Sequence, residues 1–165
     1  MVKEKKNLVL VLIGIICIAL VSRGPITGVG SVIDFIKDDL EIANSLAGFI
    51  TTIPLLIFAL FSPFISGLSQ KIGMARLLVF GMFLLLLGVL VRSYAGAAGL
   101  FLGTAVIGLG LVTANVLVPS VVKLKFPAKV GMVTGIYTTF MGVSSSFAAG
   151  YSAPLAESFG WQNTL

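Results

Sequence analysis

The sequence predicts an all-α membrane protein with five transmembrane helices, on three observations. Of the 165 residues, 58% are hydrophobic and 10% are charged, whereas a soluble domain averages roughly 25% charged residues. Five apolar stretches are long enough to cross a bilayer as helices, which takes about 20 residues. The basic residues gather at alternate ends of these stretches. Membrane-spanning strands would need shorter segments of alternating hydrophobicity, so helices are expected.

The chain is expected to form one integral-membrane domain covering 1–165. The helices are predicted at about 8–36, 45–67, 75–91, 97–122 and 130–154, and 161–165 is interpreted as the stub of a sixth helix. A lysine cluster precedes the first stretch, as in a signal peptide. No small-residue cleavage pattern follows it, so the first helix is expected to be retained.

Local signals support the next helices in order. Asn44 or Ser45 is expected to cap the second helix, and Pro127 to open the fifth near its first turn. The third stretch has no polar side chain from Leu77 to Val91, so it is expected to face lipid and line nothing. Glycine pairs four residues apart, which let membrane helices pack closely, are Gly24/Gly28, Gly99/Gly103 and Gly131/Gly135.

The distribution of basic residues predicts the orientation. One side carries Lys3, Lys5, Lys6, Lys71, Arg76, Lys123, Lys125 and Lys129. The other side carries Lys37 and Arg92, together with several acidic residues. Because basic loops stay on the cytoplasmic side, the sequence predicts a multi-pass protein of the cell membrane with a cytoplasmic N-terminus.

Arg23 lies inside the first predicted helix, roughly 22 Å along it from Leu8. A charged residue at the centre of a membrane helix costs about 2.5–3.5 kcal/mol on insertion scales. All six carboxylates lie at the boundaries of the five stretches, so none is placed to neutralise it. Pro25 follows and removes a helical N–H donor, and Thr27 lies one turn away on the same face. The sequence therefore favours an anion-binding cavity at Arg23, with snorkelling to the external headgroups as the alternative.

Two further polar positions are candidates for the same site. Asn115 lies within the fourth stretch, one turn before Pro119, and its amide needs a partner, which is either a substrate or a neighbouring helix. Tyr137 belongs to the most polar part of the fifth stretch. Both the first and fourth helices pair a polar residue with a nearby proline, and interrupted helices at matching places indicate a transporter binding site.

Other classes of function are disfavoured. The chain has no His, one Cys and carboxylates only at the boundaries of the membrane stretches, so an intramembrane hydrolase lacks its nucleophile, base or metal. No metal or other cofactor is expected. The net charge of +5 is better explained by lipid headgroups than by nucleic acid, because the basic residues lie between apolar runs.

The predicted loop between the second and third helices resembles a motif of the major facilitator superfamily. The stretch from Ser66 to Arg76 is similar to Gly-x-Leu-Ala-Asp-Arg-x-Gly-Arg-Lys. Leu68, Lys71 and Gly73 match it in register, a basic residue is displaced to Arg76, and Ser66 stands at the motif's first Gly. The family's aspartate is Gln70 here. The resemblance implies that Gly67, Lys71, Gly73 and Arg76 form a gating loop.

Three further segments narrow the resemblance to the cyanate and 2-nitroimidazole permease branch. They are 23–27, 114–119 and 135–139. Members of the family have twelve helices in two halves, and helices one, two, four and five line the central cavity while helix three is peripheral. The resemblance implies five helices of an incomplete six-helix N-terminal half. A proton-coupling Arg of the family's fourth helix is replaced by Thr104.

The expected function is secondary transport of a small anion or compact polar solute, such as cyanate or a nitroimidazole, by alternating access. Arg23 would bind the negative group, and Thr27, Asn115 and Tyr137 would donate hydrogen bonds. The expected partners are this solute, the lipid bilayer, and either the missing C-terminal half or another membrane chain. The alternative is a truncated, non-transporting subunit that packs against a full-length transporter.

Overall fold

The computed structural model describes residues 2–40, 43–94 and 96–164, without the side chains of 2–5, 44–45 and 47. The chain is helical through nearly all of these residues. The elements are α1 Val2–Leu40, α2 Asn44–Ile72, α3 Met74–Tyr94, α4 Gly96–Lys125, the 3-10 turn η1 Pro127–Lys129, α5 Val130–Phe159 and α6 Trp161–Thr164. The long helices extend past the apolar stretches, because polar residues continue the helix beyond the hydrocarbon.

Two of the expected start signals differ from the structure. The expected cap at Asn44 or Ser45 is wrong, since α2 begins at Asn44 and Ala43 occupies the cap position without a side-chain hydrogen bond. Pro127 opens η1, so α5 itself starts three residues later, at Val130. In both places the backbone begins the helix without help from a side-chain cap.

Four helices among the described residues are long and apolar enough to cross a membrane. They are Lys6–Leu40, Gly48–Ile72, Met74–Tyr94 and Gly96–Lys125. Helix α5 is 30 residues long but is not among them, and its sequence is rich in Ser, Thr and Gly. Length and composition therefore support four membrane spans, and the fifth span remains a prediction.

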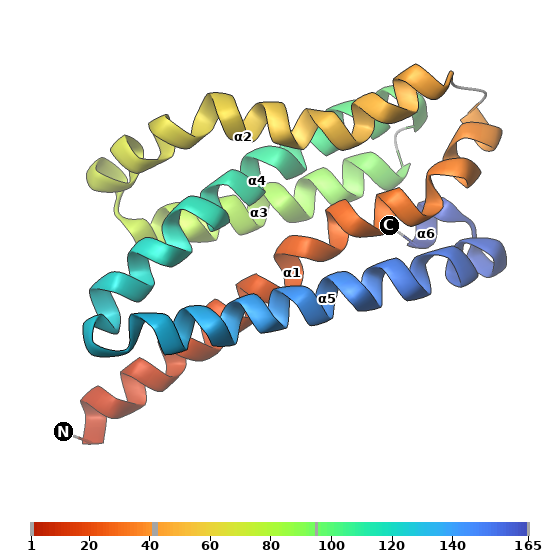
Figure 1. Ribbon diagram of the computed structural model, residues 1–165. Helices are drawn as coiled ribbons and strands as arrows, with labels where there is room; N and C mark the ends of the chain where they lie inside the picture. The colour runs from red at the N-terminus through yellow and green to blue at the C-terminus, as the bar shows by residue number, and fades with distance from the viewer. Residues whose placement is uncertain (1, 41–42, 95, 165) are drawn as a thin grey trace.

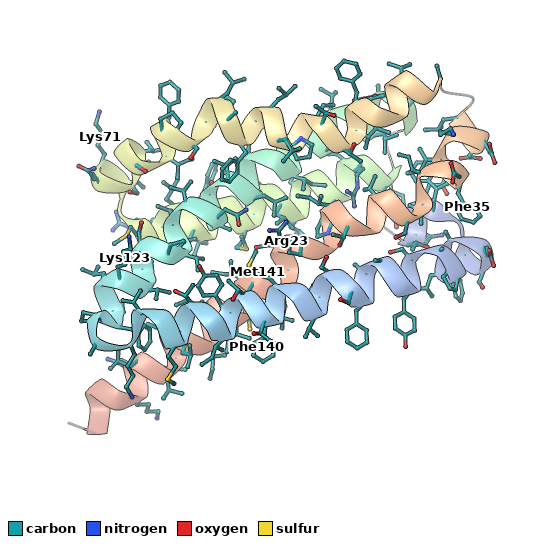
Figure 2. All side chains as sticks on the ribbon, in the orientation of Figure 1. Arg23, Phe35, Lys71, Lys123, Phe140 and Met141 are labelled. Carbon is teal, nitrogen blue, oxygen red and sulfur yellow. The ribbon has the colours of Figure 1, made fainter. Side chains whose placement is uncertain are left out.

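The long helices form two groups that lie side by side (Figure 1). Helix α4 packs along both α2 and α3, and α1 packs along α5, with α1 and α4 in contact between the groups. The α2–α3 and α4–α5 junctions share one end of the bundle, which we call the basic end because it carries Lys71 and Lys123. Phe35 of α1 lies at the opposite end (Figure 2).

A seam of four glycines joins α3 to α4. Gly81 and Gly88 of α3 face Gly103 and Gly110 of α4, and a Cβ at Gly103 would lie 2.5 Å from the backbone nitrogen of Arg92. A Cβ at Gly110 would lie 2.6 Å from the carbonyl oxygen of Gly81. Such close backbone contact is possible only without side chains, as is common between membrane helices.

The glycines expected to pack closely do so in part. Gly103 lies in the seam, but Gly24, Gly131 and Gly135 have no atom within 4 Å of an added Cβ. The expected packing role is therefore wrong for these three. The glycines of the seam repeat every seven residues within each helix. That spacing returns to the same face after two turns, and it is the sequence signal that four-residue spacing misses.

A hydrophobic cluster holds α6 against the end of the bundle opposite the basic end. Its buried members are Val29, Val32, Ile36, Ile50, Leu100, Ala156 and Trp161. The indole Nε1 of Trp161 donates to Asp39 Oδ2 at 2.8 Å, and Gln162 Nε2 donates to the same oxygen at 3.0 Å. The start of α6 is thus fixed to the end of α1 by both packing and hydrogen bonds.

Candidate functional site

Helix α1 runs without a break through the position expected to interrupt it. The helix is assigned from Val2 to Leu40 with Pro25 inside it, and α4 likewise continues through Pro119. The expectation of broken helices is therefore wrong. What remains is local weakening, because Pro25 has no N–H to donate to the carbonyl of Val21.

Arg23 is an exposed residue, labelled near the middle of α1 in Figure 2. It lines a hollow of about 370 Å³ between α1, α2 and α4. The residues lining this hollow are Ser22, Arg23, Ile26, Pro54, Leu55, Phe58, Gly108, Leu111 and Asn115. We call this space the α1–α4 hollow. Its walls are mainly apolar, so the guanidinium and the amide are its strongest polar groups.

Asn115 is half-buried on α4 and lies in the wall of the same hollow as Arg23. Its Nδ2 donates to the carbonyl of Leu111 at 2.9 Å. The partner is thus a carbonyl of its own helix, which uses one of the two N–H groups of the amide. Arg23 and Asn115 are far apart in sequence, and the contact of α1 with α4 brings them to one space.

Tyr137 of α5 is buried and lines a separate crevice of about 30 Å³. Ser22 and Asn115 line both this crevice and the α1–α4 hollow, so the two spaces adjoin. Tyr137 itself does not line the hollow. A ring packed among Ile15, Ala19 and Val133 could reach a solute there only if the helices moved.

Thr27 lines neither of these spaces. Its hydroxyl donates to the carbonyl of Arg23 at 2.9 Å, the usual way for a threonine within a helix to satisfy its hydroxyl. The structure therefore groups Arg23 with Asn115, places Tyr137 next to them, and leaves Thr27 apart. Sharing a helical face with Arg23 did not place Thr27 at the same surface of the bundle.

The expected gating loop is a tight junction between α2 and α3. Gly73 has φ +95° and its N–H donates to Ser69 O at 2.9 Å, which ends α2. A positive φ is readily adopted by glycine. Gly67, Lys71 and Arg76 are exposed around it, and Gly73 and Arg76 lie in the wall of an apolar hollow of about 550 Å³ shared with α1 and α4.

Arg92 is a buried residue that the sequence did not single out. It follows the third predicted stretch, 75–91, yet it lies within α3, is 1% exposed, and its Nη1 donates to the carbonyl of Pro25 at 2.6 Å. Its expected position beyond the third helix is therefore wrong. The acceptor lies 67 residues away, so no pattern within α3 could have indicated this contact. The expectation that 77–91 faces lipid and lines nothing is wrong in part, because Gly81 and Gly88 are buried against α4 and Leu78 lines a hollow.

Long apolar helices around a hollow that carries a cation and an amide are typical of membrane proteins of the transporter class. Comparison with known proteins agrees with this assignment. Residues 11–165 match the Major Facilitator Superfamily, and the chain belongs to that family.

Two relatives extend over most of the chain. It is 46% identical over 154 residues to the "Uncharacterized transporter YycB" of Bacillus subtilis (strain 168), covering 92% of the chain and 38% of that protein. It is 37% identical over 161 residues to the "2-nitroimidazole transporter" of Escherichia coli (strain K12), covering 97% of the chain and 41% of that protein. The chain thus spans less than half the length of either relative. No solved structure matches it.

Proposed function

We propose that the chain supplies the solute-binding surface of a secondary transporter, with the solute held at Arg23 and Asn115. The observation that carries this proposal is the α1–α4 hollow, where an exposed guanidinium and an amide share one mainly apolar space. Its volume of about 370 Å³ falls within the usual range of small-molecule sites, about 300–1,000 Å³. A guanidinium there can form two parallel hydrogen bonds to a small oxyanion or a nitro group.

The solute class is a small anion or compact polar molecule such as cyanate or a nitroimidazole. The name of the Escherichia coli relative supports a nitroimidazole, and the positive charge of Arg23 supports an anion. In the proposed site Arg23 binds the negative group and Asn115 donates a hydrogen bond. Tyr137 would reach the solute when the crevice that it lines opens toward the hollow. Thr27 would act indirectly, because its hydroxyl bonds the Arg23 carbonyl.

Alternating access needs a second surface opposite Arg23. Arg23 is exposed, so the α1–α4 hollow is open on that side and does not enclose a solute by itself. We assign that surface to the remaining part of a family transporter or to another membrane chain. The junction with Gly67, Lys71, Gly73 and Arg76 would then gate the basic end. A chain that only packs against a full-length transporter would bind no solute, and native mass measurement in mild detergent would show it bound to that transporter.

Replacing Arg23 tests the site directly. In the purified chain in nanodiscs, we expect Arg23→Ala to weaken binding of radiolabelled cyanate or 2-nitroimidazole about tenfold or more, because hydrogen bonds to charged groups contribute about 1.5–3 kcal/mol. Arg23→Lys should retain part of the affinity, since it keeps the charge but loses the planar fork. Equilibrium dialysis would give the dissociation constants.

The control for this experiment is Cys17→Ser on the same helix. Cys17 is exposed and lines neither the α1–α4 hollow nor the crevice at Tyr137, so its replacement should change the affinity by less than about threefold, within the effect of one neutral hydrogen bond. Unchanged affinity in both Arg23 variants would exclude Arg23 from the site. The absence of binding by the unaltered chain would contradict the proposal for this chain as a whole.

We also infer that the basic end faces the cytoplasm. With Cys17 replaced by serine, a single cysteine at position 38 should react with a membrane-impermeant thiol reagent in intact bacterial cells. A cysteine at position 71 should react only after the membrane is opened, because basic loops are retained inside. Asp38 and Lys71 are both exposed, so accessibility within the protein is matched. Equal reaction in intact cells would contradict the orientation.

A further inference from the structure

Arg92 joins α3 to the proline turn of α1. It is 1% exposed, and Nη1 donates to the carbonyl of Pro25 at 2.6 Å. Residues of α1, α2 and α4 surround it, among them Ile26, Thr51 and Thr104. A buried ionisable residue within a membrane helix is expensive, and such residues generally serve a function.

Gly103 is what lets Arg92 reach α1. The α4 backbone at Gly103 lies against the Arg92 backbone, since a Cβ there would be 2.5 Å from Arg92 N and 2.7 Å from its Cα. With no side chain at position 103, the last turn of α3 lies directly on α4. The guanidinium can then extend past α4 to Pro25. The glycine seam and the Arg92 hydrogen bond therefore belong to one arrangement.

The turn that Arg92 contacts is locally weakened by a proline. Pro25 removes one helical hydrogen bond, and Arg23 lies two residues before it, on the same turn. A carbonyl oxygen has two lone pairs, so Pro25 O can accept from Arg92 in addition to its helical donor. Such a charge-assisted bond fixes the position of this turn relative to α3 and α4, and hence of Arg23 relative to Asn115.

A second hydrogen bond holds the same segment from the other side. The hydroxyl of Ser144, on α5, donates to the carbonyl of Leu20. Leu20 and Pro25 lie on either side of Arg23 in the sequence. The segment 20–25 is thus bonded to α3 on one side and to α5 on the other, while Arg23 itself stays exposed in the α1–α4 hollow.

We propose that Arg92 is a positioning residue for the solute site: its hydrogen bond to Pro25 holds the Arg23 turn of α1 against α4. Arg92 does not contact the solute in this arrangement. Its hydrogen bond from α3 to α1 takes the place of the helical hydrogen bond that Pro25 removes within α1. This inference rests on the proposed role of Arg23, and it adds the residue that keeps Arg23 in place.

The test measures where position 23 lies, without any solute. A single reporter cysteine, Arg23→Cys in a Cys17→Ser chain, is reacted with neutral iodoacetamide under alkaline conditions, where the thiol is ionised with or without a nearby cation. We expect Arg92→Met to change its labelling rate by about fivefold or more, the effect of losing one charge-assisted hydrogen bond. Arg92→Lys keeps a donor and should restore the rate to within about twofold.

Two controls separate positioning from general damage. A reporter at position 71, at the basic end, should label at an unchanged rate in the Arg92→Met chain. Lys123→Met removes an exposed charge from α4 and should leave the position-23 reporter unaffected. Arg92 is bonded to a backbone carbonyl, so Arg92→Met leaves no uncompensated charge behind. Arg92→Gln is used instead if the Met variant does not fold.

A double-mutant cycle provides the sharpest discrimination. Pro25→Ala restores the missing N–H donor, so the Arg23 turn no longer depends on Arg92. In that background Arg92→Met should change the labelling rate at position 23 by less than about twofold, because the effects of coupled residues are not additive. The proposal is overturned if Arg92→Met leaves the rate at position 23 unchanged, or if the rate at position 71 changes equally. It is also overturned if Arg92→Lys behaves like Arg92→Met. Failure of solute binding would be a separate result, because no solute is used here.

Discussion

Gly103→Ala is expected to destabilise the folded chain by about 1–3 kcal/mol, the usual effect of overpacking a tight interface. The added methyl group would meet Arg92 N at 2.5 Å and Arg92 Cα at 2.7 Å. Because these are backbone atoms, neither can rotate away, and α3 must shift along its contact with α4. Gly88→Ala should have a similar effect, since its methyl would meet Ile107 N at 2.7 Å.

Gly135→Ala and Gly131→Ala are the matched controls for the seam variants. Both are helical glycines on α5 with no atom within 4 Å of an added Cβ. In these variants alanine should be neutral or slightly stabilising, because it favours the helix by about 0.5–1 kcal/mol over glycine. The free energy of unfolding, measured by denaturant titration in mixed micelles, gives the comparison. Equal stability of the Gly103→Ala and Gly135→Ala chains would show that the seam is not closely packed.

Trp161→Ala is expected to lower the free energy of unfolding by about 3–5 kcal/mol, the usual effect of removing a buried large aromatic side chain. The indole is 4% exposed and packs among Ile36, Ile50 and Leu100. Its Nε1 also donates to Asp39. The expected result is a lower free energy of unfolding and the release of α6 from the end of α1. Trp161→Phe should lower the free energy of unfolding less, because it keeps an aromatic ring in the cluster.

Phe159→Ala provides the comparison for this variant, since Phe159 is 66% exposed two residues earlier. Its stability should change by less than about 0.5 kcal/mol, as for most surface substitutions. A local measurement is also available, because Trp161 is the sole tryptophan of the chain. Asp39→Ala should shift its fluorescence to longer wavelength as the α6 contact loosens. If Trp161→Ala unfolds no more readily than Phe159→Ala, the cluster does not anchor α6.

The helices were well predicted from the sequence, because a bilayer imposes a length and an apolar composition on each span. Four of the expected stretches coincide with helices that meet both conditions. Boundaries were less well predicted. At α2, for example, Ala43 rather than Asn44 or Ser45 takes the cap position, and sequence preferences for caps are weak compared with the cooperativity of a long helix.

The candidate site was predicted in its parts but not in its arrangement. Composition singled out Arg23 and Asn115, since a cation and an amide stand out in apolar stretches, and the fold places both in the α1–α4 hollow. Thr27 shares a helical face with Arg23 by periodicity, yet its hydroxyl bonds the α1 backbone. Periodicity describes one helix and does not tell which neighbour each part of that face will meet.

By itself, the sequence determined the membrane class, the positions of the long helices and the polar residues available for a site. These depend on local properties: length, hydrophobicity and charge along one segment. The tertiary structure alone decided that α3 lies against α4 along four glycines, and that Arg92 is buried at Pro25 instead of lying beyond the third helix. Those features depend on the contact between segments far apart in the chain, where the absence of one side chain at Gly103 allows another to pass.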